Sequence, residues 1–277
     1  MDSDGKEARR KRRVEERQAA EEHELIEQAE KALRLYTLDA EQLLERASDE
    51  TEFLIEKALP AGMVSFLTGP PGQFKSWLAY DAMLAVLHER DWLDFKCNKR
   101  RGRVFAISLD NPAKEFGRMM KVLGLKAEDK RNFRSHVLGA SDELPDGFPS
   151  ALRLPDHHDE IMMVIDYFKP DLIMIDSFRQ SHTMNEMSHQ DMDRIIQCLR
   201  DMTARNAAVL VIHHPPKPSR EPNAPEIHTL SGAGSLDAGA DVTIFVNKGK
   251  ILWKKTRGWT GKEGKKGDER DQARTFK

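Results

Sequence analysis

The sequence predicts an α/β sandwich with a mostly parallel central sheet, and three observations lead to this prediction. Apolar runs of strand length occur at residues 63–67, 104–109, 172–175 and 208–212. Segments with apolar residues at helical spacing separate these runs, and alternating strands and helices are typical of a parallel sheet covered by helices. Residues 172–175 are apolar throughout, which indicates a central strand buried on both faces.

The helices between the strands are indicated by their apolar stripes and by their ends. Residues 77–87 and 161–168 carry apolar residues at helical spacing, so each should lay one side on the sheet. Pro112 stands where a helix can open, because proline is tolerated in the first turn. Ser188 and Asp191 have the spacing of a helix cap, which predicts a further helix directly after them.

Near its C-terminal end the sandwich is predicted to carry a β-hairpin. Residues 243–246 and 250–254 are strand-like and flank residues 247–249, Asn-Lys-Gly, which suit a tight turn. We expect the folded domain to span residues 59–260, followed by a basic tail at residues 261–277.

The N-terminal part of the chain differs in composition from this domain. We expect residues 1–22 to be a disordered basic tail, either merely solvated or binding phosphates through the basic block at residues 9–13. Residues 23–58 are expected to form a helical extension, because apolar residues recur at helical spacing from Leu25. One apolar stripe on a charged helix requires a partner surface, from this domain or from a neighbouring subunit.

Composition excludes some classes of protein. The formal net charge is −2, so total charge does not indicate nucleic-acid binding, and the distribution of charge must decide. Cys97 and Cys198 are the two cysteines, too few for a disulfide framework and consistent with a reducing compartment. No apolar run approaches the ~20 residues that cross a bilayer, and the N-terminus lacks the apolar core of a signal peptide. We therefore expect a cytoplasmic protein without a membrane partner.

A phosphate-binding loop follows the first apolar strand. Residues 69–76 match G-x-x-x-x-G-K-[ST] except for Phe74, and an amphipathic helix follows them. The amides of such a loop wrap the phosphates of a nucleotide, Lys75 would neutralise the β- and γ-phosphates, and Ser76 would offer its hydroxyl to Mg²⁺. The expected cofactors are therefore ATP and Mg²⁺. The predicted nucleotide-binding residues are Gly69, Pro70, Pro71, Gly72, Gln73, Phe74, Lys75 and Ser76.

Two aspartates end predicted strands, where α/β sheets place their ligands. Asp176 follows the apolar run at residues 172–175 and would hold Mg²⁺ through water. The next residue is Ser177 rather than the glutamate that many such ATPases use to activate water. Asp110 ends another strand and is our candidate for the catalytic base; the alternative is a cap for the helix that Pro112 opens.

Three stretches resemble the RepA-type hexameric replicative helicases, a family of RecA-like ATPases. They are the phosphate loop with residues 77–79 after it, the motif D-[ST]-x-R-x-x-H-x-x-x-E-x-x-x-x-x-M over residues 176–192, and the strand at residues 209–212 with His213-His214 and the small residues 231–235. The resemblance covers about residues 59–260. It implies a RecA-like P-loop sandwich and a motor on single-stranded DNA. Together with the C-terminal β-hairpin and the N-terminal helical extension predicted above, this gives the expected fold.

The resemblance also assigns roles to individual residues. His213 or His214 would sense the γ-phosphate, and we take His214 as the candidate. Lys255 and Arg257 resemble the K-x-R signature of DnaB-like helicase domains, in which these cations reach the nucleotide of the next subunit. This implies a homo-oligomeric ring, such as a hexamer, whereas the alternative is a solvated basic hairpin. Phe74 for glycine and Asp110 for glutamate depart from the family.

The DNA contacts implied by the resemblance fall in two loops. Lys217 and Arg220 in the proline-rich loop after residue 214 would meet phosphates of single-stranded DNA, and residues 183–189 form the other candidate loop. Neither loop has an aromatic residue to stack on bases, so we expect contacts to the DNA backbone. Two other functions stay open: an ATPase that loads or remodels partner proteins, and a nucleotide-binding scaffold with little hydrolysis.

Overall fold

The computed structural model of the protein describes residues 3–46, 51–98, 102–139, 149–215, 230, 235–256 and 274–275. The chain divides into two compact units, Met1–Glu50 and Thr51–Lys277, each of which is described by itself.

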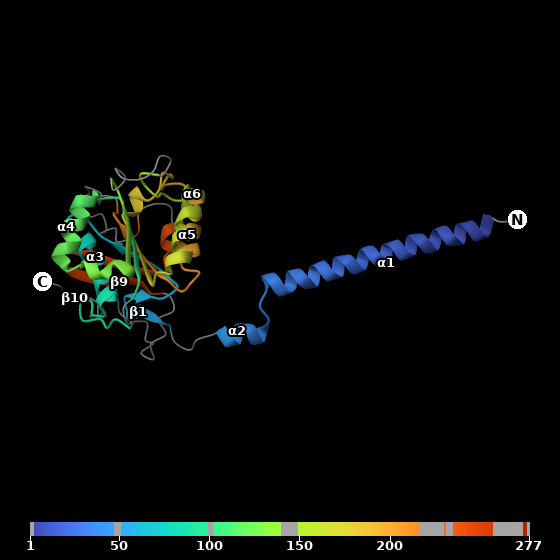
Figure 1. Ribbon diagram of the computed structural model, residues 1–277, viewed down its shortest axis with the longest axis horizontal. Helices are drawn as coiled ribbons and strands as arrows, with labels where there is room; N and C mark the ends of the chain where they lie inside the picture. The colour runs from blue at the N-terminus through green and yellow to red at the C-terminus, as the bar shows by residue number, and fades with distance from the viewer. Residues whose placement is uncertain are drawn as a thin grey trace, which may run out of the picture. The chain divides into compact units, whose positions relative to one another are not determined.

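The N-terminal unit consists of two helices, α1 (Ser3–Tyr36) and α2 (Ala40–Arg46) (Figure 1). Helix α1 runs through the segment that the sequence suggested was a disordered tail. After residue 5 this segment has neither glycine nor proline, and Ala, Glu, Arg and Lys favour the helix. Arg17 and Glu21 add an ion pair one turn apart, with nitrogen and oxygen at 3.3 Å. Asp39 caps α2 by accepting from the amide of Gln42.

The second unit is built on a sheet with eight strands among the described residues, in the order β10-β9-β8-β3-β7-β6-β4-β5. The strands from β8 to β5 in this order are parallel, whereas β9 is antiparallel to both β8 and β10. A separate antiparallel pair consists of β1 (Phe53–Ile55) and β2 (Leu59–Pro60). The strands of the large sheet are β3 (Val64–Thr68), β4 (Val104–Ser108), β5 (Phe133–Val137), β6 (Leu172–Asp176), β7 (Ala208–His213), β8 (Val242–Asn247), β9 (Lys250–Thr256) and β10 (Arg274–Thr275).

Helices cover both faces of this sheet, as Figure 1 shows. Helices α3 (Lys75–His88) and α4 (Ala113–Leu123) pack on one face. Helices α5 (His158–Phe168), α6 (His189–Met202) and the short α7 (Ser235–Gly239) pack on the other. Within the described connections lie the 3₁₀ turns η1 (Ala127–Arg131) and η3 (Phe178–Gln180). The predicted α/β sandwich is confirmed.

Alternation along the strands decides which helix layer each side chain meets. In β6, Leu172 and Met174 pack in the core beneath α3 and α4, whereas Ile173 and Ile175 pack in the core beneath α5 and α6. Successive side chains of a strand point to opposite faces, so Asp176 lies on the α3 side. The same rule places Ser108 of β4 on the α3 side, because Val104 and Ala106 belong to that core.

The structure also confirms the hairpin and adds strands that the sequence did not predict. Lys248 and Gly249 have φ angles of 47° and 71°, the positive values that a two-residue hairpin turn requires between β8 and β9. Strand β5 escaped prediction because its middle residues, Arg134 and Ser135, are polar and exposed at the sheet edge. Among the described residues, no helix is long and apolar enough to cross a membrane.

Candidate functional site

The loop between β3 and α3 takes the shape that phosphate binding requires. Gly69 lies so close to the carbonyl of Val246 on β8 that a β-carbon would collide with it. Gly72 has a φ of 75° and no atom within 4 Å of where a β-carbon would stand, so the loop is open at this point. Gln73 joins the loop to the hairpin, because its Oε1 accepts from the amide of Lys248 at 2.6 Å.

Phe74 occupies the position of the last motif glycine and adopts the conformation that glycine usually supplies. Its φ is 60° and its ψ is 21°, in the left-handed region, where it precedes the first residue of α3. A phenylalanine is strained there, and such strain is common at ligand-binding loops. Phe74 is 65% exposed, so most of the residue faces solvent. This departure from the motif therefore leaves the loop accessible to phosphates.

Lys75 begins α3 and is nearly fully buried, with 3% of the residue exposed. Its Nζ donates to the carbonyl of Pro70 at 2.7 Å, which turns the ammonium back over the loop. Burial lowers the pKa of this ammonium to about 8, although Asp176 and Asp110 act in the opposite direction. A buried cation at a loop of this kind is suited to bind an anion such as a phosphate.

Asp176 ends β6 and is completely buried. Its Oδ2 accepts from the hydroxyl of Tyr80 at 2.5 Å, whereas Oδ1 has no hydrogen-bond partner within the described part of the chain. Burial raises the pKa of this carboxyl to about 6, which the Tyr80 hydrogen bond, the Ser76 hydroxyl and Lys75 partly offset. An unpartnered carboxylate oxygen in the core costs free energy unless a ligand satisfies it.

Ser76 and Asp176 fit Mg²⁺. Both offer oxygen, the ligand that this cation prefers, and Oδ1 of Asp176 has no protein partner among the described residues. The same residues contain no group of three or more His, Cys, Asp or Glu side chains that could hold a metal by themselves. A cation here would therefore depend on phosphate and water for its other ligands, as Mg²⁺ does in nucleotide sites.

Asp110 lies directly beyond β4 with its side chain exposed. Its amide and that of Leu109 both donate to the carbonyl of Asp176, at 3.2 and 2.6 Å, which joins the ends of β4 and β6. The carboxylate is near enough to act electrostatically on Lys75 and His214. The alternative role as helix cap is not observed, because Pro112 is the N-cap residue of α4 and no side chain bonds there.

The histidine pair divides between the two faces of the sheet. His213 lies on the α6 side, where its ring is buried edge-on to Phe66 and its Nδ1 is 3.2 Å from Oγ1 of Thr68. His214 follows the strand end and is half-buried. Burial and the charge of Lys75 lower the pKa of its imidazole, against the effect of Asp110. His214 therefore belongs to the phosphate-loop side, whereas His213 packs in the core.

The other residues of the motif over 176–192 are structural in this geometry. His182 is buried edge-on against Phe178, with ring centroids 4.6 Å apart, and Met192 lies in the core beneath α6. Arg179 donates to Glu186 at 3.3 Å. These contacts shape the turn between β6 and α6 rather than the phosphate loop.

Several predicted residues fall where the structure gives no side chain. Lys255 pairs with Thr243 in the β8–β9 hairpin, but the position of its side chain is not described. Arg257, Lys217, Arg220 and residues 231–234 lie outside the described residues. The structure thus brings together the phosphate loop, Asp110, Asp176 and His214, and leaves the DNA-binding and trans-acting residues as predictions.

Sequence analysis missed Tyr80, which lies in the middle of the site. It stands four residues after Ser76, hence on the same side of α3, and its hydroxyl bonds Asp176. A helix position four residues beyond the motif serine was the signal that sequence reasoning could have used.

A parallel sheet flanked by two helix layers, with a phosphate loop after β3 and a buried aspartate at the end of β6, defines a RecA-like P-loop ATPase. A family model described as AAA domain matches residues 28–220, and the chain belongs to this family. A solved KaiC-like protein from the hyperthermophilic archaeon Pyrococcus horikoshii is similar in structure, with a TM-score of 0.52 at 15% identity over 76% of this chain and 89% of that one. At that identity the likeness shows the fold alone. A search of curated proteins found no match.

Proposed function

We propose that this P-loop ATPase is an ATP-hydrolysing motor that acts on single-stranded DNA as a homo-oligomer. The observation that carries the nucleotide part is the buried Oδ1 of Asp176, unpartnered among the described residues, beside Lys75 and the phosphate loop. The DNA part rests on the three sequence stretches that resemble RepA-type helicases.

The proposed chemistry assigns a separate task to each side chain. The loop amides and Lys75 bind the β- and γ-phosphates and offset their charge. Ser76 and Asp176 would hold Mg²⁺, which would neutralise charge that develops on the phosphate oxygens. Asp110 orients the attacking water and accepts its proton, and His214 contacts the γ-phosphate. Because Asp110 is one methylene shorter than glutamate, we expect slow hydrolysis.

The oligomer is proposed because the cations of the hairpin end would complete the site of a neighbouring subunit. Lys255 lies on β9, whose partner strand β8 runs beside β3 and the phosphate loop. From that hairpin Lys255 and Arg257 would reach the γ-phosphate of the next copy in a ring. Lys217 and Arg220 would then face DNA in the channel, contacting phosphates rather than bases.

The test is ATP turnover measured with and without single-stranded DNA of mixed sequence. Stimulation by DNA that falls with rising salt supports the motor, because phosphate contacts release counterions. Turnover indifferent to DNA contradicts it and favours an ATPase that remodels protein partners. ATP binding without turnover also contradicts it and favours a nucleotide-binding scaffold, a reading consistent with the short side chain of Asp110.

A mixing experiment tests the shared site. Arg257→Ala should retain ATP affinity and lose turnover by roughly 10³-fold or more, as when an arginine finger is removed. Lys75→Ala subunits keep Arg257 but lack the phosphate-binding lysine. If sites are shared, mixing the two inactive variants restores part of the turnover. Unchanged turnover in Arg257→Ala would remove this residue from the mechanism.

A further inference from the structure

Tyr80 is a buried polar residue for which the proposed chemistry has no role. It lies on α3 with 0% of the residue exposed. Its ring packs edge-on against Phe116 of α4, with centroids 5.2 Å apart, so packing in the core fixes the ring. The hydroxyl therefore stands at a defined point between α3, β4 and β6.

The hydrogen bonds of this hydroxyl have only one consistent set of directions. Asn111 can contribute only its Nδ2 hydrogens, at 3.2 Å, so the tyrosine oxygen accepts from it. Tyr80 donates its single proton to Oδ2 of Asp176 at 2.5 Å. Ser108, at 3.4 Å, is then left to donate.

This bond determines which carboxylate oxygen remains for a ligand. With Oδ2 held by Tyr80, the plane of the Asp176 carboxyl is fixed and Oδ1 is the oxygen left without a partner among the described residues. Groups that hydrogen-bond to metal-binding carboxylates orient them and tune their affinity.

We propose that Tyr80 is a positioning residue that holds Asp176 so that Oδ1 faces the Mg²⁺ of the bound nucleotide. The inference rests on the proposed nucleotide site and adds to it a residue outside the phosphate-loop motif. Tyr80 acts through Asp176 and touches neither nucleotide nor metal. It also joins two parts of the site, because its oxygen accepts from Asn111, the neighbour of Asp110.

The test separates metal binding from nucleotide binding. Tyr80→Phe removes one oxygen and keeps the ring that packs on Phe116. ADP affinity is measured in EDTA with a fluorescent analogue, and Mn²⁺ affinity of the ADP-saturated protein is measured by electron paramagnetic resonance. We expect Mn²⁺ affinity to fall by about 10–100-fold, as for other groups that support metal ligands, while metal-free ADP affinity stays unchanged.

Tyr167→Phe is the matched control, because Tyr167 on α5 is 92% exposed and should leave both affinities unchanged. Equal Mn²⁺ affinity in folded Tyr80→Phe and the unaltered protein overturns the positioning role and leaves the nucleotide site intact. Failure of the unaltered protein to bind ADP overturns both. If Tyr80→Phe does not fold, Asn111→Ala decides: it should weaken Mn²⁺ binding in the same direction by a smaller factor, and no change overturns the proposal.

Discussion

Both ends of the central sheet carry polar side chains, but the hydrogen bonds that these side chains make differ between the two ends. At the carboxyl end, Asp176 is fully buried and has one oxygen without a partner among the described residues. Lys75 at the same end is also buried. The hydrogen bond described above for its ammonium is to a carbonyl of its own loop.

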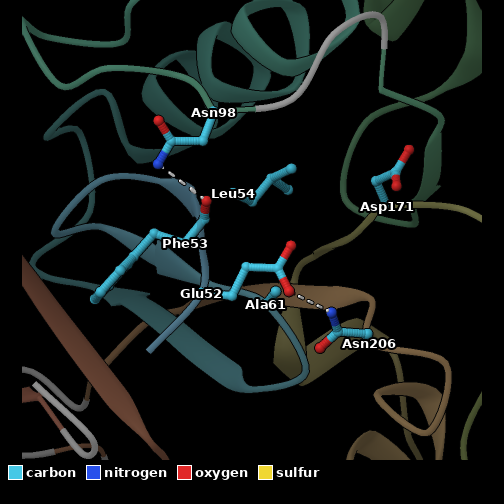
Figure 2. A pocket seen from close by; sticks show the side chains of 7 residues that line it. All are labelled: Glu52, Phe53, Leu54, Ala61, Asn98, Asp171 and Asn206. Carbon is cyan, nitrogen blue, oxygen red and sulfur yellow. Dashed lines mark hydrogen bonds between the residues drawn. The ribbon is translucent and has the colours of Figure 1, made fainter. Parts of the chain in front are cut away.

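At the amino end, a polar pocket lies beside the starts of β3, β6 and β7. Asn206 donates to Glu52 at 2.9 Å and Asn98 donates to the carbonyl of Phe53 at 3.2 Å, as the dashed lines in Figure 2 show. Asp171 accepts from the amide of Arg103 at 2.7 Å. The bonds of Asn206 and Asn98 reach the segment that contains β1, whereas that of Asp171 joins the starts of β4 and β6.

The two ends thus differ in whether a buried charged group has all of its hydrogen-bonding atoms partnered within the described residues: Asp176 does not. A polar group whose hydrogen bonds are made within the fold stabilises that fold, whereas a buried carboxylate oxygen without a partner costs free energy that a bound cation can offset. We therefore expect mutations at the carboxyl end to change ATP binding and turnover, and mutations at the amino end to change only the stability of the fold.

The largest expected effect on nucleotide affinity is the loss of binding in Lys75→Ala. Removal of a buried cation that pairs with phosphate should weaken ATP affinity by at least ~100-fold. Isothermal titration with ATP and Mg²⁺ measures it, with Lys114→Ala on the exposed side of α4 as the control. Unchanged ATP affinity in Lys75→Ala would mean that the buried ammonium is a structural group. It would contradict the difference drawn between the two ends of the sheet.

Asp110→Asn should affect turnover more than binding. The amide keeps the size of the side chain but cannot accept the proton of the attacking water, and loss of a general base typically costs about 10²–10⁴-fold. Steady-state ATPase assays give kcat, and titration gives the affinity. A variant with unchanged kcat would move the role of base to another group.

Much of the fold was predictable because most strands are buried on both faces. The runs that became β3, β4, β6 and β7 are almost wholly apolar, so they are visible in the sequence without knowledge of their neighbours. Strand β5 lies at the sheet edge and shows no such run. The N-terminal half of helix α1 was not predicted, because the charge of this segment was taken to indicate disorder.

The candidate site was predictable only where its residues are close in sequence. Lys75 and Ser76 follow from one motif, and Asp176 from the end of one strand. Tyr80 and Asp176 are 96 residues apart, and Gln73 and Lys248 are 175 apart. Such contacts depend on the order of the strands and on the face of the sheet from which each side chain projects. Neither can be derived from a single sequence. The same limit explains why His213 and His214 could not be told apart before the structure.

A smaller effect is expected from pH, through Lys75. Burial lowers the pKa of its ammonium to about 8 in the free protein, whereas bound phosphate favours the charged form. Nucleotide binding should therefore take up a proton at higher pH, and metal-free ADP affinity should decline from about pH 8 upward, approaching about tenfold per pH unit. Fluorescence titrations in EDTA between pH 7 and 9.5 measure this. A flat profile would show that the bound and free proteins hold the same proton.

The smallest expected effect, and the sharpest check on the amino end, is that of Asn206→Ala. The substitution removes the bond to Glu52 and places alanine at a φ of 64°, so the free energy of unfolding should fall by about 1–2 kcal/mol. Asn206→Gly removes the same bond but tolerates that φ, so it should cost less than the alanine variant. Denaturant unfolding measures both. ATP affinity should be unchanged in each, because Asn206 lies at the end of the sheet opposite the phosphate loop; a weakened affinity in folded Asn206→Gly would show that the two ends of the sheet are coupled.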